Sequence, residues 1–127
     1  MTATFTTVGT RFANMNGSRG NHYAHQQLMN AWKLLGVAAI RSTGCEPVAG
    51  PVTITAVVHR TTRASSDAHN VTPTIKACVD AAVAAGLILD DNDDVVTALT
   101  VKRGPIWRVD GKARPAITLT IEHQEEA

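Results

Sequence analysis

The chain has 127 residues, 44% of them hydrophobic, and a formal net charge of +1 at pH 7. This length fits one domain with a buried core that does not need disulfides to fold. The two cysteines, Cys45 and Cys78, lack the spacing of a zinc motif, so we expect thiols in a reducing compartment. The longest apolar run, residues 81–89, is too short to cross a bilayer, and the first ten residues do not resemble a signal peptide. We therefore expect a cytoplasmic protein without membrane contact.

The charge is distributed unevenly along the sequence. Residues 1–66 contain six Lys or Arg and one acid, whereas residues 67–127 contain six Lys or Arg and ten acids. The first half could bind a polyanion, and the acidic cluster would no longer repel that polyanion once it held a metal ion. Taken alone, the scattered bases are better explained as solvated surface charge.

The N-terminal part of the chain predicts a strand, a loop and a helix. Residues 2–10 indicate a weak strand, and residues 14–21 are polar and glycine-rich, as in a loop. Residues 22–40 indicate an amphipathic helix, and Gly44 lies just beyond its expected end. The apolar positions that recur at helical spacing are Leu28, Trp32, Leu35 and Ala39.

The remaining elements complete an α+β domain that covers residues 1–127. Alternating apolar residues predict strands at 52–59, 95–102 and 116–122, and residues 72–85 predict a second helix. A hairpin is expected within residues 106–112, turning at Asp110-Gly111. We predict a single domain with a mixed β-sheet and two main helices packed on it.

Two acidic clusters flank the second predicted helix. Thr72 is the expected N-cap, Pro73 the first helical residue and Gly86 a left-handed stop. If strands on either side return both helix ends to one sheet, the carboxylates of Asp67 and Asp91 can converge on a divalent cation. This arrangement suggests phosphoryl transfer on nucleic acid.

On the same helix, Lys76 and Asp80 are one turn apart and share a face. An exposed ion pair explains them if they are taken alone. Next to the flanking acids, a lysine that contacts phosphate or stabilises a leaving oxygen is also credible.

Two metal-binding motifs can be set aside. Residues 90–94 match the first ligand positions of an EF-hand, but Val95 replaces the glycine and Val101 replaces the bidentate glutamate. His22 and His25 are three residues apart and have no second ligand pair at zinc spacing. We expect these histidines to line a DNA-facing loop or to solvate the helix start.

Together these motifs resemble the RusA-type Holliday-junction resolvases of bacteria, prophages and phages. The family shows an arginine-rich approach, Asp-x-Asp-Asn, a Lys followed four residues later by Asp, a helix ending in Ala-Gly, and Asp-Asp before a valine-rich strand. The N-terminal region, with Asn14 to Arg19, His22 and Trp32, is also similar to the family's Asn/Arg/His loop before its first helix. The matching central residues are Arg60, Arg63, Asp67-Ala68-His69-Asn70, Lys76, Asp80, Ala85-Gly86, Asp90-Asp91 and Val95-Val96.

The resemblance implies a homodimeric endonuclease that depends on Mg²⁺ or Mn²⁺ and resolves four-way DNA junctions by paired symmetric nicks. It also implies a bacterial cell, with a phage or prophage as a candidate source. The implied catalytic residues are Asp67, His69, Lys76 and Asp91, and the implied metal ligands are Asp67, His69, Asp80 and Asp91. The implied DNA-binding residues are Arg19, His22, Arg60, Arg63, Asn70 and Lys76.

The chain departs from the family pattern at two points. His69 stands where a second catalytic aspartate is expected, and three extra residues lie between Asn70 and Lys76. An imidazole suits manganese or zinc better than magnesium, so His69 could bind a softer ion, act as a base, or mark a site without activity. Two rivals therefore stay open: a DNA-structure-binding protein without turnover, and a metal-dependent hydrolase of smaller phosphate esters.

Overall fold

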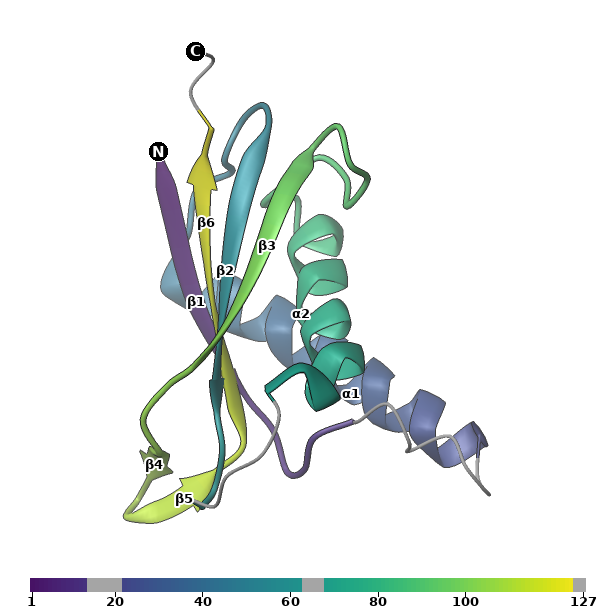
Figure 1. Cartoon of the computed structure of the whole chain (residues 1–127), viewed down its shortest axis with the longest axis vertical. Helices are drawn as coiled ribbons and strands as arrows, with labels where there is room; N and C mark the ends of the chain where they lie inside the picture. Colours follow the sequence, from purple (N-terminus) through teal and green to yellow (C-terminus); the bar gives the residue numbers. More distant parts are fainter. Residues whose placement is uncertain (14–21, 63–67, 125–127) are drawn as a thin grey trace.

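The computed structural model describes residues 1–13, 22–62 and 68–124 (Figure 1). It confirms the predicted α+β class and adds a short 3₁₀ helix, η1, ahead of the second helix. The elements are β1 (Thr2–Val8), α1 (His22–Thr43), β2 (Val52–His59), η1 (Ala68–Val71), α2 (Thr72–Ala84), β3 (Val96–Arg103), β4 (Trp107–Val109), β5 (Lys112–Arg114) and β6 (Ala116–His123).

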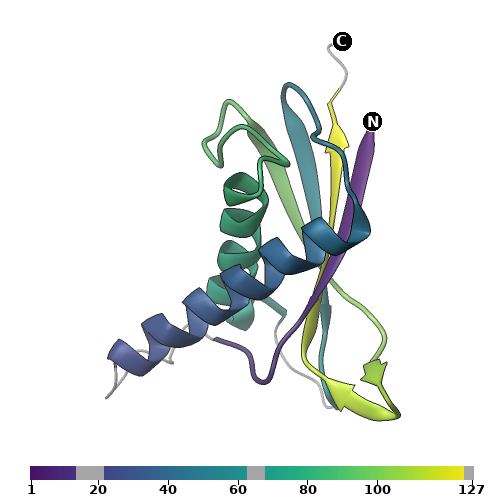
Figure 2. The ribbon, with the colours of Figure 1, turned by 180° about the vertical axis from the view of Figure 1, so that it is seen from behind.

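The main sheet has four strands in the order β1-β6-β2-β3. β6 pairs antiparallel with both β1 and β2, whereas β2 and β3 are parallel. The pair is parallel because α2 carries the chain back along the sheet between the two strands. Both helices lie on one face of the sheet (Figures 1 and 2).

Strand alternation decides which side chains enter the core. In β2, Val52, Ile54, Ala56 and Val58 are fully buried, while the alternate threonines are only half-buried. The buried set faces the helices, since successive strand residues point to opposite sides of a sheet. This division was predicted from the sequence and is confirmed.

Helix α1 crosses α2 closely because its contact residue is a glycine. A Cβ on Gly36 would come within 2.7 Å of the Cβ of Ala81. The buried stripe of α1 is Trp32, Gly36 and Ile40, so the prediction that Leu35 belongs to it is wrong; Leu35 is 43% exposed. Glycine is not recognised as an apolar residue in a hydrophobic pattern. The predicted buried stripe therefore included Leu35 in place of the neighbouring Gly36.

The two predicted ends of α2 compare differently with the structure. The predicted N-cap is wrong: Val71 occupies that position without a side-chain capping bond, and Thr72 is already helical. The predicted stop is confirmed, since Gly86 has φ +75°. The Gly86 amide donates to the Val83 carbonyl at 3.0 Å, and the next amide reaches back to Ala82 at 2.8 Å, which is a Schellman motif.

Strands β4 and β5 form the predicted hairpin. Asp110 and Gly111 both have positive φ, at 52° and 80°. Two such residues define a type I′ turn, whose twist matches the flanking strands.

The helices of the described ranges include none with the length and apolar character needed to span a membrane.

Candidate functional site

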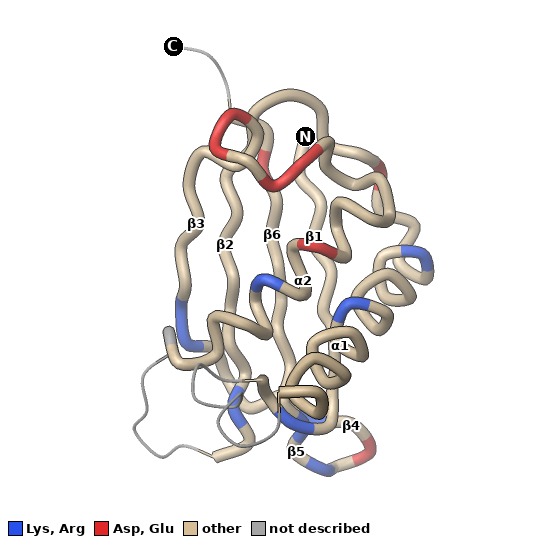
Figure 3. Tube along the Cα trace, turned by 90° about the vertical axis from the view of Figure 1, so that its right-hand side faces the viewer, with Lys and Arg blue, Asp and Glu red and all other residues tan. Residues whose placement is uncertain are grey.

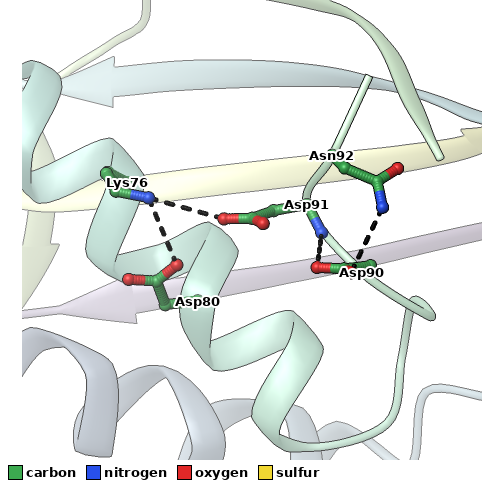
Figure 4. Close-up of polar contacts among 5 residues, drawn as sticks. All are labelled: Lys76, Asp80, Asp90, Asp91 and Asn92. Atoms are coloured by element: carbon green, nitrogen blue, oxygen red, sulfur yellow. Dashed lines mark hydrogen bonds and ion pairs between the residues drawn. The ribbon is translucent and has the colours of Figure 1, made fainter. Parts of the chain in front are cut away.

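The loop after α2 is shaped by its own polar side chains (Figure 4). The Asp90 carboxylate accepts hydrogen bonds from the Asp91 amide at 2.7 Å and from the Asn92 side chain at 3.2 Å. The Asn92 side-chain oxygen accepts from the amides of Asp94 and Val95, both at 3.1 Å. These local bonds fix the turn into β3 and leave the Asp91 carboxylate directed toward α2 (Figure 4).

Lys76 lies between two carboxylates that come from different elements. Its Nζ is 3.7 Å from Oδ1 of Asp80, one helical turn away, and 3.4 Å from Oδ2 of Asp91 in the loop. The hydrogen bond and the positive charge of Lys76 hold the pKa of Asp91 below its ordinary value. The structure thus brings together three of the predicted site residues.

An apolar groove adjoins this cluster between α2 and β3. It has a volume of about 370 Å³, and Lys76 and Asp91 are among its lining residues. The other lining residues are Thr72, Ile75, Val79, Val96, Leu99 and Val101. Because β3 is an edge strand, α2 covers it only partly, and Leu99 remains 46% exposed.

The donor set fits a divalent cation only in part. Asp80 and Asp91 offer carboxylate oxygens, the ligands that magnesium and manganese prefer. Both carboxylates contact the Lys76 ammonium group, so positive charge is attracted to the space between them. Within the described ranges, no group of three His, Cys, Asp or Glu side chains could hold a metal ion. A metal centre would need further ligands, for which Asp67 and His69 are the sequence candidates.

The other predicted site residues are distributed over several places. Arg19, Arg63 and Asp67 lie outside the described residues. His69 and the exposed Asn70 belong to η1, directly ahead of α2. His22 is the exposed first residue of α1, whose first ten residues contain no buried side chain.

Charge is segregated by position in space more than by position in the sequence. Figure 3 shows acidic residues at the end of the sheet where β3 begins, and basic residues at the opposite end, around the end of β3 and the β4–β5 hairpin. The segment 99–116 contributes five Lys or Arg and one acid, although it belongs to the half of the chain that is acidic overall. Two candidate anion-binding residues at this end, Arg103 and Arg108, were therefore not predicted from the sequence. Their signal was local, an arginine on each side of Gly104-Pro105.

Comparison with known proteins gives no match for this chain, either among protein-family models or among curated proteins. The resemblance to RusA-type resolvases therefore stays a prediction made from the motifs.

Proposed function

We propose that the protein is a divalent-metal-dependent endonuclease that acts on four-way DNA junctions, in the manner of RusA-type resolvases. The observation that carries this proposal is the meeting of Lys76 with Asp80 and Asp91 across two elements. The predicted Asp67-x-His69-Asn70 motif lies immediately before the helix that bears Lys76. The basic end of the sheet supports a polyanionic substrate.

Each residue has a role that its chemistry allows. Asp67 and Asp91 would hold the divalent cation, with Asp80 and His69 as further ligands or hydrogen-bonding partners. Such a cation, when bound, would supply Lewis-acid polarisation of the scissile phosphate. Lys76 would release its carboxylates on substrate binding and stabilise the negative charge that develops on the phosphate.

The direct test is incubation of synthetic four-way junctions with the protein and Mg²⁺ or Mn²⁺. We expect paired nicks at symmetric positions, and no product when the metal ion is removed by chelation. A linear duplex with the sequence of one arm serves as the substrate control. Absence of cleavage with both ions would contradict the proposed function.

Asp91→Asn is the most informative variant for this activity, and Asp93→Asn in the same loop is its matched control. The Asp93 carboxylate makes no ion pair within the part of the chain that the structure describes. We expect Asp91→Asn to bind junctions about as well as wild type and to cleave them about 10²-fold more slowly or worse. Asp93→Asn should cleave normally. If Asp91→Asn cleaves as fast as Asp93→Asn and the wild type, Asp91 has no part in the mechanism.

His69 is tested by metal preference. If its imidazole is a ligand, manganese should support cleavage better than magnesium in the wild type. His69→Asp would then shift the preference toward magnesium, and His69→Ala would lower activity with either ion. Undiminished cleavage by His69→Ala would show that the imidazole takes no part.

A junction-binding protein without turnover is the second candidate. It is favoured by the small number of carboxylates that meet at Lys76 in the described residues. This candidate predicts junction binding with or without metal and cleavage in neither case. A wild-type protein that only binds, together with a His69→Asp variant that cuts, would select it. Hydrolysis of a model phosphate ester in place of junctions would instead select a small-ester hydrolase.

A further inference from the structure

A second pocket lies at the basic end of the molecule, where the parallel strands β2 and β3 end. It has a volume of about 440 Å³ and is lined by three arginines and four uncharged residues. None of the described lining residues is acidic. We call it the arginine pocket, and its lining residues are Arg60, Thr62, Arg103, Gly104, Pro105, Ile106 and Arg108.

The three guanidinium groups come from three separate segments of the chain, and each makes a contact that helps to orient it. Arg60, directly after β2, lies over the ring of Phe12 at 5.7 Å, and Phe12 in turn stacks on the buried Trp32. Arg103, the last residue of β3, donates to the Thr62 carbonyl at 3.5 Å, and Arg108 of β4 donates to the Gly111 carbonyl at 3.5 Å. These contacts hold the three side chains at the pocket.

One wall of the arginine pocket is the segment after β3, which packs tightly against β2 at Gly104. A Cβ on Gly104 would come within 2.3 Å of Cγ1 of Val57 and 2.9 Å of the His59 ring. The buried His59 ring donates through Nδ1 to the Pro105 carbonyl at 2.8 Å, and Trp107 packs against the ring at 5.1 Å. The segment that links Arg103 to Arg108 is therefore fixed before any ligand arrives.

The arginines of the pocket provide the paired donors that a phosphate group accepts. Guanidinium groups bind phosphate oxygens with paired hydrogen bonds, and three of them around one cavity provide a strong anion site. Positive charge also continues beyond the pocket, through Lys102 near the end of β3 and through Lys112 and Arg114 of β5. This basic surface is larger than a single phosphate group. It therefore favours a ligand with a chain of phosphates over a small metabolite.

The arginine pocket and the groove beside Lys76 both border the same strand, β3. On β3, Leu99, Val101 and Arg103 share one side of the strand, and the first two line the groove beside Lys76. The third lines the arginine pocket. One face of β3 thus leads from the proposed cleavage site to the arginine pocket, so one polyanion could reach both.

We propose that the arginine pocket binds backbone phosphates of a DNA arm next to the site of cleavage, with Arg103 and Arg108 as contacts in addition to Arg60. The choice of DNA as the polyanion rests on the proposed function. The binding itself does not require turnover, so a protein that binds DNA without cutting it would still use this pocket.

The test measures binding of a fluorescent four-way junction and of a duplex arm, without metal, over a range of salt concentrations. The variants are Arg103→Ala, Arg108→Ala and their combination, with Lys33→Ala on the exposed side of α1 as the charge-matched control. Each arginine variant should weaken binding several-fold and lower the slope of log affinity against log salt by about one. Arg108→Lys should recover part of the loss, and thermal unfolding of all variants should match that of wild type.

Three results would overturn the proposal. The first is wild-type affinity and salt slope in Arg103→Ala and in Arg108→Ala. This result would not contradict the proposed nuclease function. The second is a wild-type protein that does not bind DNA in this metal-free assay; the proposed nuclease activity is then decided separately, by the cleavage assay with metal. The third is a mononucleotide or inorganic phosphate that binds as tightly as the duplex arm. Arginine-dependent DNA binding without cleavage would support the pocket and contradict the nuclease.

Discussion

Lys76 acts on two carboxylates at once, and the consequence can be measured at one of them. The hydrogen bond and charge of Lys76 lower the pKa of Asp91. We expect Lys76→Met to raise that pKa toward its ordinary value, because the stabilised carboxylate loses its partner. Titration of the Asp91 carboxyl by NMR measures the change, and Lys33→Met should leave it unaltered. An unchanged Asp91 pKa in Lys76→Met would contradict the contact.

The same shift fixes the sign of a pH effect on stability. Because the pKa of Asp91 is lowered in the folded state, the contact stabilises the fold at pH values above the ordinary pKa. This stabilisation is lost as pH falls through the lowered pKa. The side chains are exposed, so solvent keeps the effect small. Denaturant titrations should show wild type and Lys76→Met differing most near neutral pH and converging in acid.

The two thiols should differ in reactivity. Burial raises the pKa of Cys78 to about 12, whereas Cys45 is partly exposed. Since the thiolate is the reactive form, alkylation at pH 8 should modify Cys45 and spare Cys78 in the folded protein. Mass spectrometry identifies the modified residue, and a sample in denaturant should react at both. Rapid modification of Cys78 under native conditions would contradict its burial.

At the scale of elements, the crossing of the β3–β4 connection over β2 depends on Gly104. Gly104→Ala should destabilise the fold by about 1–3 kcal/mol, because the added methyl overlaps Val57. Denaturant unfolding measures the loss. Val57→Ala removes the nearest atom, so combining it with Gly104→Ala should recover part of the stability. Strictly additive losses would show that the overlap is relieved elsewhere.

Elements whose signals are local could be predicted from the sequence, and contacts between elements could not. Gly86 ends α2 and Asp110-Gly111 forms the hairpin turn, since positive φ is a property of single residues. Leu35 was misassigned because the helix crossing is set by Gly36 against Ala81, a contact between distant segments. Likewise, Lys76 and Asp80 follow from helical spacing, whereas the approach of Asp91 depends on the turn built by Asp90 and Asn92.

For the whole molecule, folding redistributes the charge that the sequence displays. The sequence suggested a basic first half and an acidic second half, but the β4–β5 hairpin carries bases of the second half to the end of the sheet where Arg60 lies. The acidic loop lies at the other end. Such a dipolar surface would orient a polyanion before contact, and raised salt should weaken this steering.

The symmetry of the proposed substrate leads to a prediction about assembly. A four-way junction needs two nicks related by a two-fold axis, and one chain offers one cluster of Lys76, Asp80 and Asp91. A C2 dimer is the simplest source of a second cluster, so we expect a dimer at micromolar concentration in sedimentation experiments. Mixed dimers with one Asp91→Asn subunit should nick a single strand of the junction. A stable monomer that still makes paired nicks would contradict this assembly, because one cluster would then have to act twice.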